Sequence, residues 1–196
     1  VLALAIGLAN LAVWDRLHPP VTAPDFAGPI GGLAYNAYGR WDSPLIDKRP
    51  DDASVAHDMD VLAGLTGRIR SYSSSEFPAL PALADAKGLL LTAGVWLDQR
   101  EDNVRREIAA LERAVREHSS IERVIVGNET LLHGTWAVDD LITKMREVRR
   151  RVRKPVSTAE PWHVWLRYPE LAKAADFITV HLLPYWEGLP PGPALD

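Results

Sequence analysis

The strongest constraint on the fold of this chain is a repeated alternation of two kinds of segment. Short apolar stretches alternate with longer stretches whose apolar residues recur at helical spacing. Repeated strand–helix alternation is typical of a parallel sheet covered by helices. From residue 31 onward we expect strands within 31–38, 67–73, 89–97, 121–129, 154–161 and 176–184, and helices within 51–65, 78–88, 101–118, 138–152 and 164–175.

Local signals support these helices. The clearest helix, 101–118, carries Val104, Ile108, Leu111 and Val115 in line on one face. Gly88 closes the helix before it, because glycine is the preferred residue just past a helix end. Pro169 lies inside the last expected helix and predicts a break there.

Two architectures fit six strands with a helix in every gap: an open doubly wound sheet and a (β/α)8 barrel. The open sheet usually carries a glycine-rich phosphate-binding turn after a strand, and no such motif occurs here. We therefore expect an α/β fold of the (β/α)8 TIM-barrel type. We expect this barrel to be incomplete, with about six strand–helix units, because a whole barrel takes roughly 250 residues.

The N-terminal residues differ in character from the rest. Residues 1–17 are almost uniformly apolar, and residues 18–30 are rich in proline. A bilayer span takes ~20 apolar residues, so the first segment suits a truncated membrane anchor, with a signal-peptide remnant as the second interpretation and a buried helix as the third. We expect a Pro-rich linker at 18–30 and the N-terminal portion of the barrel at 31–196.

Composition excludes some functions. The formal net charge is −4, which gives no reason to expect a nucleic-acid partner. The chain has no cysteine, so disulfides and cysteine-based metal sites are impossible. His133, His163 and His181 do not have the spacing of a helical metal pair, and we expect no metal site.

Aromatic and acidic residues gather where the expected strands end. Six of the seven tryptophans lie at or just after these ends, on the barrel face where active sites form: Trp41, Trp96, Trp136, Trp162, Trp165 and Trp186. Acidic residues follow the same pattern: Asp42, Glu76, Asp98, Glu129, Glu160 and Glu187. Flat apolar rings beside carboxylates suit a sugar-binding cleft, because the ring covers the C–H face of a pyranose and polar groups bind its hydroxyls.

Glu129 is the best candidate for a working carboxyl group. It ends a Val/Ile-rich strand directly after Asn128. Burying an acidic group at such a position costs free energy unless it has a use. Glycoside cleavage needs two carboxyl groups, one protonated and one ionised. The neighbouring amide could bind a sugar hydroxyl.

Five motifs in order, each at a strand end, resemble glycoside hydrolase family 17, the β-1,3-glucanase family. They are "GRIRSYS" at 67–73, "GVWLD" at 94–98, "VIVGNETLLHG" at 124–134, "STAEPWHVWLRYPELA" at 157–172 and "DFITVHLLPYWEG" at 176–188. The likeness is strongest to bacterial members, which are often membrane-anchored or joined to a glycosyltransferase. It extends from about Gly31 to Gly188.

The resemblance implies a retaining double displacement with Glu129 as general acid/base and Asn128 beside it, and no metal or organic cofactor. Residues expected to contact the glucan are Asn128, Tyr35, Arg70, Tyr72, Trp96, Trp162, His181, Tyr185, Trp186 and Glu187. The family's nucleophilic glutamate follows the seventh strand, whereas this sequence stops after the sixth. Glu160 and Glu187 are the local substitutes, better suited to substrate hydrogen bonding or structural support.

The leading hypothesis is a β-1,3-glucan-active retaining hydrolase or transglycosylase, present as a fragment that alone is expected to be inactive. The alternative is a non-catalytic β-glucan-binding module. The expected partner is a β-glucan oligosaccharide or polysaccharide, with membrane attachment through residues 1–17. A fused glycosyltransferase domain is a further candidate partner. The membrane attachment would place the catalytic domain in the periplasm or outside the cell.

Overall fold

The computed structural model describes residues 2–18, 28–40, 42–43 and 48–189. The chain divides into two units. One spans residues 29–181, and the other combines residues 1–28 with residues 182–196. The two units are described separately, and the larger one contains every strand of the sheet.

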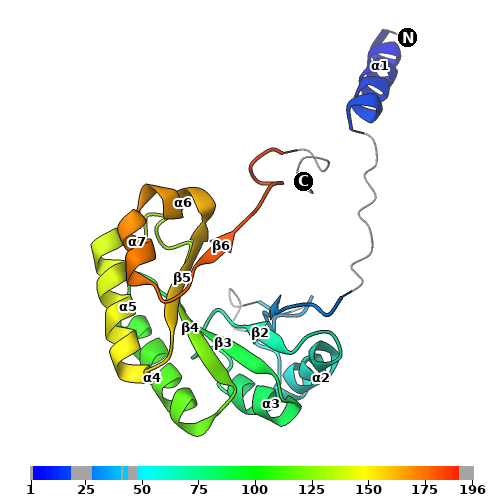
Figure 1. Cartoon of the computed structure of the whole chain (residues 1–196). Coiled ribbons are helices and arrows are strands. Elements are labelled where there is room, and N and C mark those ends of the chain that lie inside the picture. Colours follow the sequence, from blue (N-terminus) through cyan, green and yellow to red (C-terminus); the bar gives the residue numbers. More distant parts are fainter. Residues whose placement is uncertain (1, 19–27, 41, 44–47, 190–196) are drawn as a thin grey trace. The chain divides into compact units, whose positions relative to one another are not determined.

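The larger unit is built on one six-stranded sheet in which every neighbouring pair is parallel. The strands follow each other in chain order from one edge to the other (Figure 1). This order confirms the expected incomplete (β/α)8 barrel, because an open doubly wound sheet reverses its strand order. The strands are β1 (Leu33–Ala34), β2 (Arg68–Arg70), β3 (Leu90–Val95), β4 (Ile121–Asn128), β5 (Val156–Pro161) and β6 (Thr179–His181).

Helices fill all five gaps between the strands, as expected (Figure 1). The last gap holds two short helices, because the chain leaves the helical conformation at Tyr168, directly before Pro169. The helices are α2 (Asp52–Ala63), α3 (Leu80–Lys87), α4 (Glu101–Glu117), α5 (Val138–Val152), α6 (Trp162–Arg167) and α7 (Pro169–Ala174).

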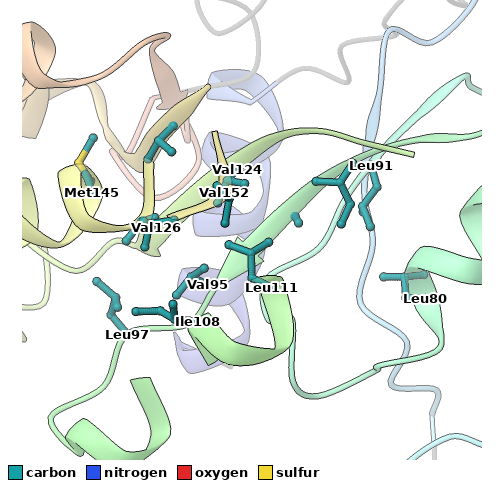
Figure 2. Packing of buried hydrophobic residues seen from close by; sticks show 14 of the residues in the cluster. Leu80, Leu91, Val95, Leu97, Ile108, Leu111, Val124, Val126, Met145 and Val152 are labelled. Atoms are coloured by element: carbon teal, nitrogen blue, oxygen red, sulfur yellow. The ribbon is translucent and has the colours of Figure 1, made fainter. Parts of the chain in front are cut away.

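The hydrophobic core lies between the sheet and these helices (Figure 2). The apolar face of α4 is buried as its spacing predicts, with Leu111 fully inaccessible to solvent. Val124 and Val126 of β4 and Met145 of α5 belong to the same cluster and are equally inaccessible. Burying a side chain of this size stabilises the fold by roughly 1.5–3 kcal/mol.

Two glycines shape this framework. Gly88 ends α3 in the left-handed conformation (φ 67°), which confirms the expected helix stop. Gly94 of β3 packs so closely on the chain after β2 that an added Cβ atom would overlap the backbone of Ser71 and Tyr72. The end of β3 and the residues after β2 are therefore held together at the carboxyl-terminal end of the sheet, where the candidate site lies.

The smaller unit contains the N-terminal apolar segment, which forms α1 (Leu2–Leu17). All described side chains of α1 are exposed. The turns at 183–189 are held by backbone hydrogen bonds, including one from the Leu189 N–H to the Pro184 carbonyl (3.0 Å). In the part of the chain that the structure describes, no helix combines the length and apolarity needed to cross a bilayer.

Candidate active site

Three strands deliver polar side chains to the same edge of the sheet. Arg70 is the last residue of β2, Asn128 the last of β4 and His181 the last of β6. Glu129 follows β4 directly. Because the strands are parallel, their carboxyl ends meet at one edge, which is where active sites of β/α barrels form.

These four side chains form one hydrogen-bonded network. Arg70 Nη2 donates to Asn128 Oδ1 at 2.7 Å, and Arg70 Nη1 lies 3.3 Å from His181 Nε2. His181 Nδ1 in turn lies 2.7 Å from Glu129 Oε1. The second carboxylate oxygen, Glu129 Oε2, is 3.4 Å from Nε2 of the exposed His133.

The network fixes the protonation pattern of His181. A guanidinium nitrogen can only donate, so His181 Nε2 accepts from Arg70. The ring proton then resides on Nδ1 and is donated to Glu129 Oε1. Neutral His181 therefore orients the Glu129 carboxyl group and leaves the other oxygen to interact with His133 or with a ligand.

The backbone of Glu129 is unusual. Its φ angle is +52°, a left-handed conformation that residues other than glycine rarely adopt. The Glu129 N–H donates to the Ala159 carbonyl of β5 (2.8 Å), and its carbonyl accepts from the His133 N–H (3.0 Å). Backbone strain of this kind costs of order 1–3 kcal/mol and is concentrated at functional sites.

Arg70 is the centre of the cluster. Burial lowers the pKa of its guanidinium group, and the nearby Tyr72 and Glu129 act in the opposite direction. The guanidinium carbon lies 4.8 Å from the centre of the Tyr72 ring, within cation–π range. Arg70 Nε is buried and has no hydrogen-bond partner within the described residues. One donor at the site is therefore unused.

Glu160, at the end of β5, is fully buried. Its Oε1 accepts from the Leu131 N–H at 2.8 Å and its Oε2 from the Leu132 N–H at 3.2 Å. Burial raises the pKa of the Glu160 carboxyl group, and the hydrogen bonds from the turn oppose this shift. With both oxygens occupied and no exposed surface, Glu160 is not free to attack a substrate.

The predicted aromatic residues fall into different environments. Trp96 follows β3 and Trp162 begins α6, and their exposed fractions of 45% and 43% leave both rings open to a ligand. Trp165 is a core residue whose indole N–H donates to the Thr179 carbonyl (3.1 Å). The indole N–H of Trp136 donates to the Asp98 carbonyl (3.0 Å), and this hydrogen bond joins the loops after β3 and β4.

The other predicted contact residues have local partners or belong to the smaller unit. The Tyr35 hydroxyl donates to Asp58 Oδ2 of α2 (2.8 Å), and burial is the main cause that raises the pKa of this phenol. Tyr185, Trp186 and Glu187 belong to the smaller unit, where the first two rings meet edge to face with their centres 5.2 Å apart. Trp41 lies outside the described residues.

Glu107 of α4 is a buried carboxylate that was not among the residues predicted from the sequence. It accepts from the Ser74 N–H (2.9 Å) after β2 and from the Trp96 N–H (3.1 Å) after β3. It also accepts from the hydroxyls of Ser73 and Ser75. An available signal was its position, since 104, 107, 108 and 111 form one buried helical stripe.

A hollow of about 530 Å³ lies beside the loops that follow β3 and β4. Trp136, Gln99, Thr135 and Asp140 are among the residues that line it, and Glu129 is not. In the part of the chain described here, no group of three or more histidine, aspartate or glutamate side chains is placed to hold a metal ion.

The fold and this cluster define an incomplete β/α barrel that carries a carboxyl group, Glu129, within a polar cluster at the carboxyl ends of its strands. The family model for the BtgE/BtgC glycoside hydrolase domain matches residues 32–195. The chain therefore belongs to this glycoside hydrolase family, which is of the family 17 type indicated by the sequence motifs.

Individual relatives agree with this assignment. The chain is 30% identical over 180 residues to the "Probable glucan endo-1,3-beta-glucosidase btgC" of Aspergillus clavatus. It is 27% identical over 184 residues to the "Glucan 1,3-beta-glucosidase" of Arthroderma benhamiae. Among solved structures, a β-1,3-glucanosyltransferase mutant from Rhizomucor miehei with bound laminaritriose superposes with a TM-score of 0.66 at 27% identity.

These matches cover most of this chain and a smaller part of each relative. They span 81% and 85% of this chain in the two fungal sequences, but 25% and 58% of those proteins. The structural match covers 81% of this chain and 59% of the transferase. All three relatives are fungal, so they give no support to the expected bacterial type.

Proposed function

We propose that this chain carries the acid/base half of a retaining enzyme that acts on β-1,3-glucan. The observation that carries the proposal is the cluster around Glu129, whose carboxyl group is oriented by His181 and adjoined by Asn128. The relatives named as glucan glucosidases and a glucanosyltransferase support the substrate class.

In the proposed mechanism, the Glu129 carboxyl group gives its proton to the leaving glycosidic oxygen, and its carboxylate then takes a proton from the incoming water or sugar hydroxyl. Asn128, held by Arg70 through Oδ1, keeps its side-chain NH₂ donors available to a sugar hydroxyl. Trp96 and Trp162 provide exposed rings for pyranose faces. Water completes hydrolysis, and a sugar hydroxyl completes transglycosylation.

The test is Glu129→Gln in the full-length gene product. Turnover of laminarin should fall by roughly 10²–10⁴-fold, the usual contribution of a general acid, with glucan binding retained. An aryl β-glucoside with an activated leaving group needs little protonation and should lose far less. Glu122→Gln, at the other end of β4, is the matched control. Equal losses on both substrates would refute the acid role.

A non-catalytic glucan-binding module is the second candidate, favoured by one observation. Double displacement needs a second carboxylate about 5 Å from the first, across the bond that breaks. Glu160 is buried and has both oxygens occupied, so it does not meet this need. Binding of laminarin oligosaccharides by the 196-residue polypeptide, without release of reducing sugar, would support this candidate.

We also propose that the protein is attached to a membrane through its N-terminal segment, with the glucan-active part in the periplasm or outside the cell. The support is α1, whose apolar side chains are exposed along the whole helix. The proposed bacterial source and fused glycosyltransferase rest on the sequence resemblance alone. Deleting residues 1–28 from the full-length gene product should turn a membrane-bound protein into a soluble one with its fold unchanged. Aggregation of the shortened protein, with a freely soluble longer form, would contradict attachment.

A further inference from the structure

The carboxylate of Glu160 holds the turn that begins at Glu129. Its two oxygens accept from the N–H groups of Leu131 and Leu132, at 2.8 and 3.2 Å. The N–H of Thr130 also stabilises its charged form. Two successive backbone N–H groups therefore donate to one carboxylate that has no solvent-accessible surface, and the N–H before them favours its charged form.

A buried carboxylate in this position needs a physical reason. Taking a carboxyl group out of water disfavours its charged form, and burial is the largest influence on Glu160. An uncharged glutamine or an apolar residue would avoid this cost. What glutamate provides is two acceptor oxygens with no donor, which matches a group of N–H donors pointing at the same place.

The turn itself is built around Glu129. Ala159, the residue before Glu160, accepts from the Glu129 N–H at 2.8 Å and pairs in the sheet with Asn128. The end of β5 thus binds the turn at its start through the Ala159 carbonyl and in its middle through Glu160. The left-handed conformation of Glu129 lies between these two contacts.

We propose that Glu160 is a positioning residue for Glu129, which fixes the strained turn so that the Glu129 carboxyl group faces the glycosidic oxygen. This inference rests on the proposed acid role of Glu129. It differs from a nucleophilic role, because the Glu160 oxygens are occupied by backbone donors. It differs from a general packing role, because the contacts of Glu160 are concentrated on the three residues after Glu129.

The test is Glu160→Gln in the full-length gene product, assayed on laminarin and on an activated aryl β-glucoside. Glutamine keeps the size of the side chain but turns an NH₂ donor toward backbone N–H donors. The kcat for laminarin should fall by roughly 10- to 100-fold, as expected for a misplacement of about 1 Å, while KM changes little. The activated substrate should lose much less, because it needs little protonation.

A double-mutant cycle separates positioning from independent effects. If Glu160 acts through Glu129, adding Glu160→Gln to Glu129→Gln should cause no further loss on laminarin. Additive losses would overturn the proposal. Equal losses of the Glu160→Gln variant on both substrates would reduce Glu160 to a purely structural residue. Loss of all turnover by Glu160→Ala with rescue by azide would make it the nucleophile.

The outcome also separates this inference from the proposed function. If Glu129→Gln itself shows no dependence on the leaving group, the acid role fails and the inference fails with it. If Glu129→Gln behaves as an acid variant and Glu160→Gln keeps full laminarin turnover, only the positioning role is refuted. Should Glu160→Gln not fold, Glu160→Asp, which keeps the charge but shortens the reach, is expected to show the same leaving-group dependence. If Glu160→Asp shows no leaving-group dependence, the positioning role is refuted in the same way.

Discussion

Two residues other than glycine adopt a left-handed backbone in the described chain, and they do so for different reasons. Arg153 ends α5, where its N–H donates to the Arg149 carbonyl (3.0 Å) in an ordinary helix stop. Glu129 instead ends a buried strand and is held by contacts from β5 and His181. The same φ of 52° therefore marks a local helix cap in one case and a candidate reactive group in the other.

Arg70 is the residue on which the rest of the cluster depends. In Arg70→Met, Asn128 Oδ1 and His181 Nε2 both lose their donor. Both acceptors are partly buried, and leaving a buried acceptor unpaired costs about 1–3 kcal/mol, so we expect a lower unfolding free energy in urea together with loss of laminarin turnover.

Arg68→Met is the matched control on the same strand. Arg68 pairs with Glu122 at 3.3 Å and its side chain is half exposed. The Glu122 side chain is only 18% exposed, but it also lies 3.3 Å from Arg123 and keeps that cationic partner in the variant, so stability should change by less than about 1 kcal/mol and turnover should be kept. A larger loss for Arg68→Met than for Arg70→Met would contradict the central role of Arg70.

At the scale of elements, α4 does more than cover the sheet. Its buried Glu107 joins the loops after β2 and β3, which carry Tyr72 and Trp96. Glu107→Gln removes one acceptor oxygen and adds a donor among donors. Hydrogen bonds to a charged group contribute about 1.5–3 kcal/mol, so we expect the unfolding free energy in urea to fall by an amount in that range. The KM for laminarin should rise, because the two loops move.

Glu112→Gln is the control for this prediction. Glu112 lies on the same helix, and its Oε1 is 3.6 Å from Nη1 of Arg151. Its substitution should change stability by less than about 1 kcal/mol and leave KM unaltered. Equal KM effects of the two variants would show that Glu107 does not shape the loops.

Asp85, near the end of α3, links this helix to the start of β4. Burial raises the pKa of its carboxyl group, but the donors of Ser120 and His118 outweigh this effect and lower it. A lowered pKa in the folded state means that the stabilisation is present above the ordinary aspartate pKa of about 3.9 and is lost as the pH falls through the folded value.

Asp85→Asn should therefore lower the unfolding free energy at neutral pH by about 1 kcal/mol, through weaker bonds to the Ser120 N–H and His118. The difference from the unchanged protein should shrink as the pH is lowered to a value acidic enough to protonate the carboxyl group in the folded state as well. Urea unfolding at a series of pH values measures this. A difference that stays constant down to that pH would contradict it.

The elements were predictable because their signals are local. The apolar stripe of α4, the glycine after α3 and Pro169 in the last gap each specify structure over a few residues, and all three expectations are confirmed. The contacts between elements were not predictable in the same way. Glu160 and Glu107 bind backbone N–H groups, which have no sequence signature, and the Arg70–Asn128 pair joins residues 58 positions apart.

At the scale of the molecule, the sheet of the larger unit has two edges, β1 and β6. Closure of a barrel fixes strand number, tilt and stagger together, and an open edge presents unpaired N–H and C=O groups. Near the β6 edge, Ile178 and Val180 have exposed fractions of 50% and 40%. This half-barrel therefore has an apolar edge that other chains can pair with.

We accordingly expect the polypeptide of these 196 residues, expressed alone, to self-associate and to release no reducing sugar from laminarin. Val180→Lys should shift it toward the monomer, because a charge on an edge strand disfavours pairing between chains. Arg167→Lys, which keeps the charge on α6, should leave association unchanged. Size-exclusion chromatography with light scattering measures self-association, and a reducing-sugar assay measures turnover of laminarin. A monomeric polypeptide that turns over laminarin would show that the acid/base half needs no further carboxylate.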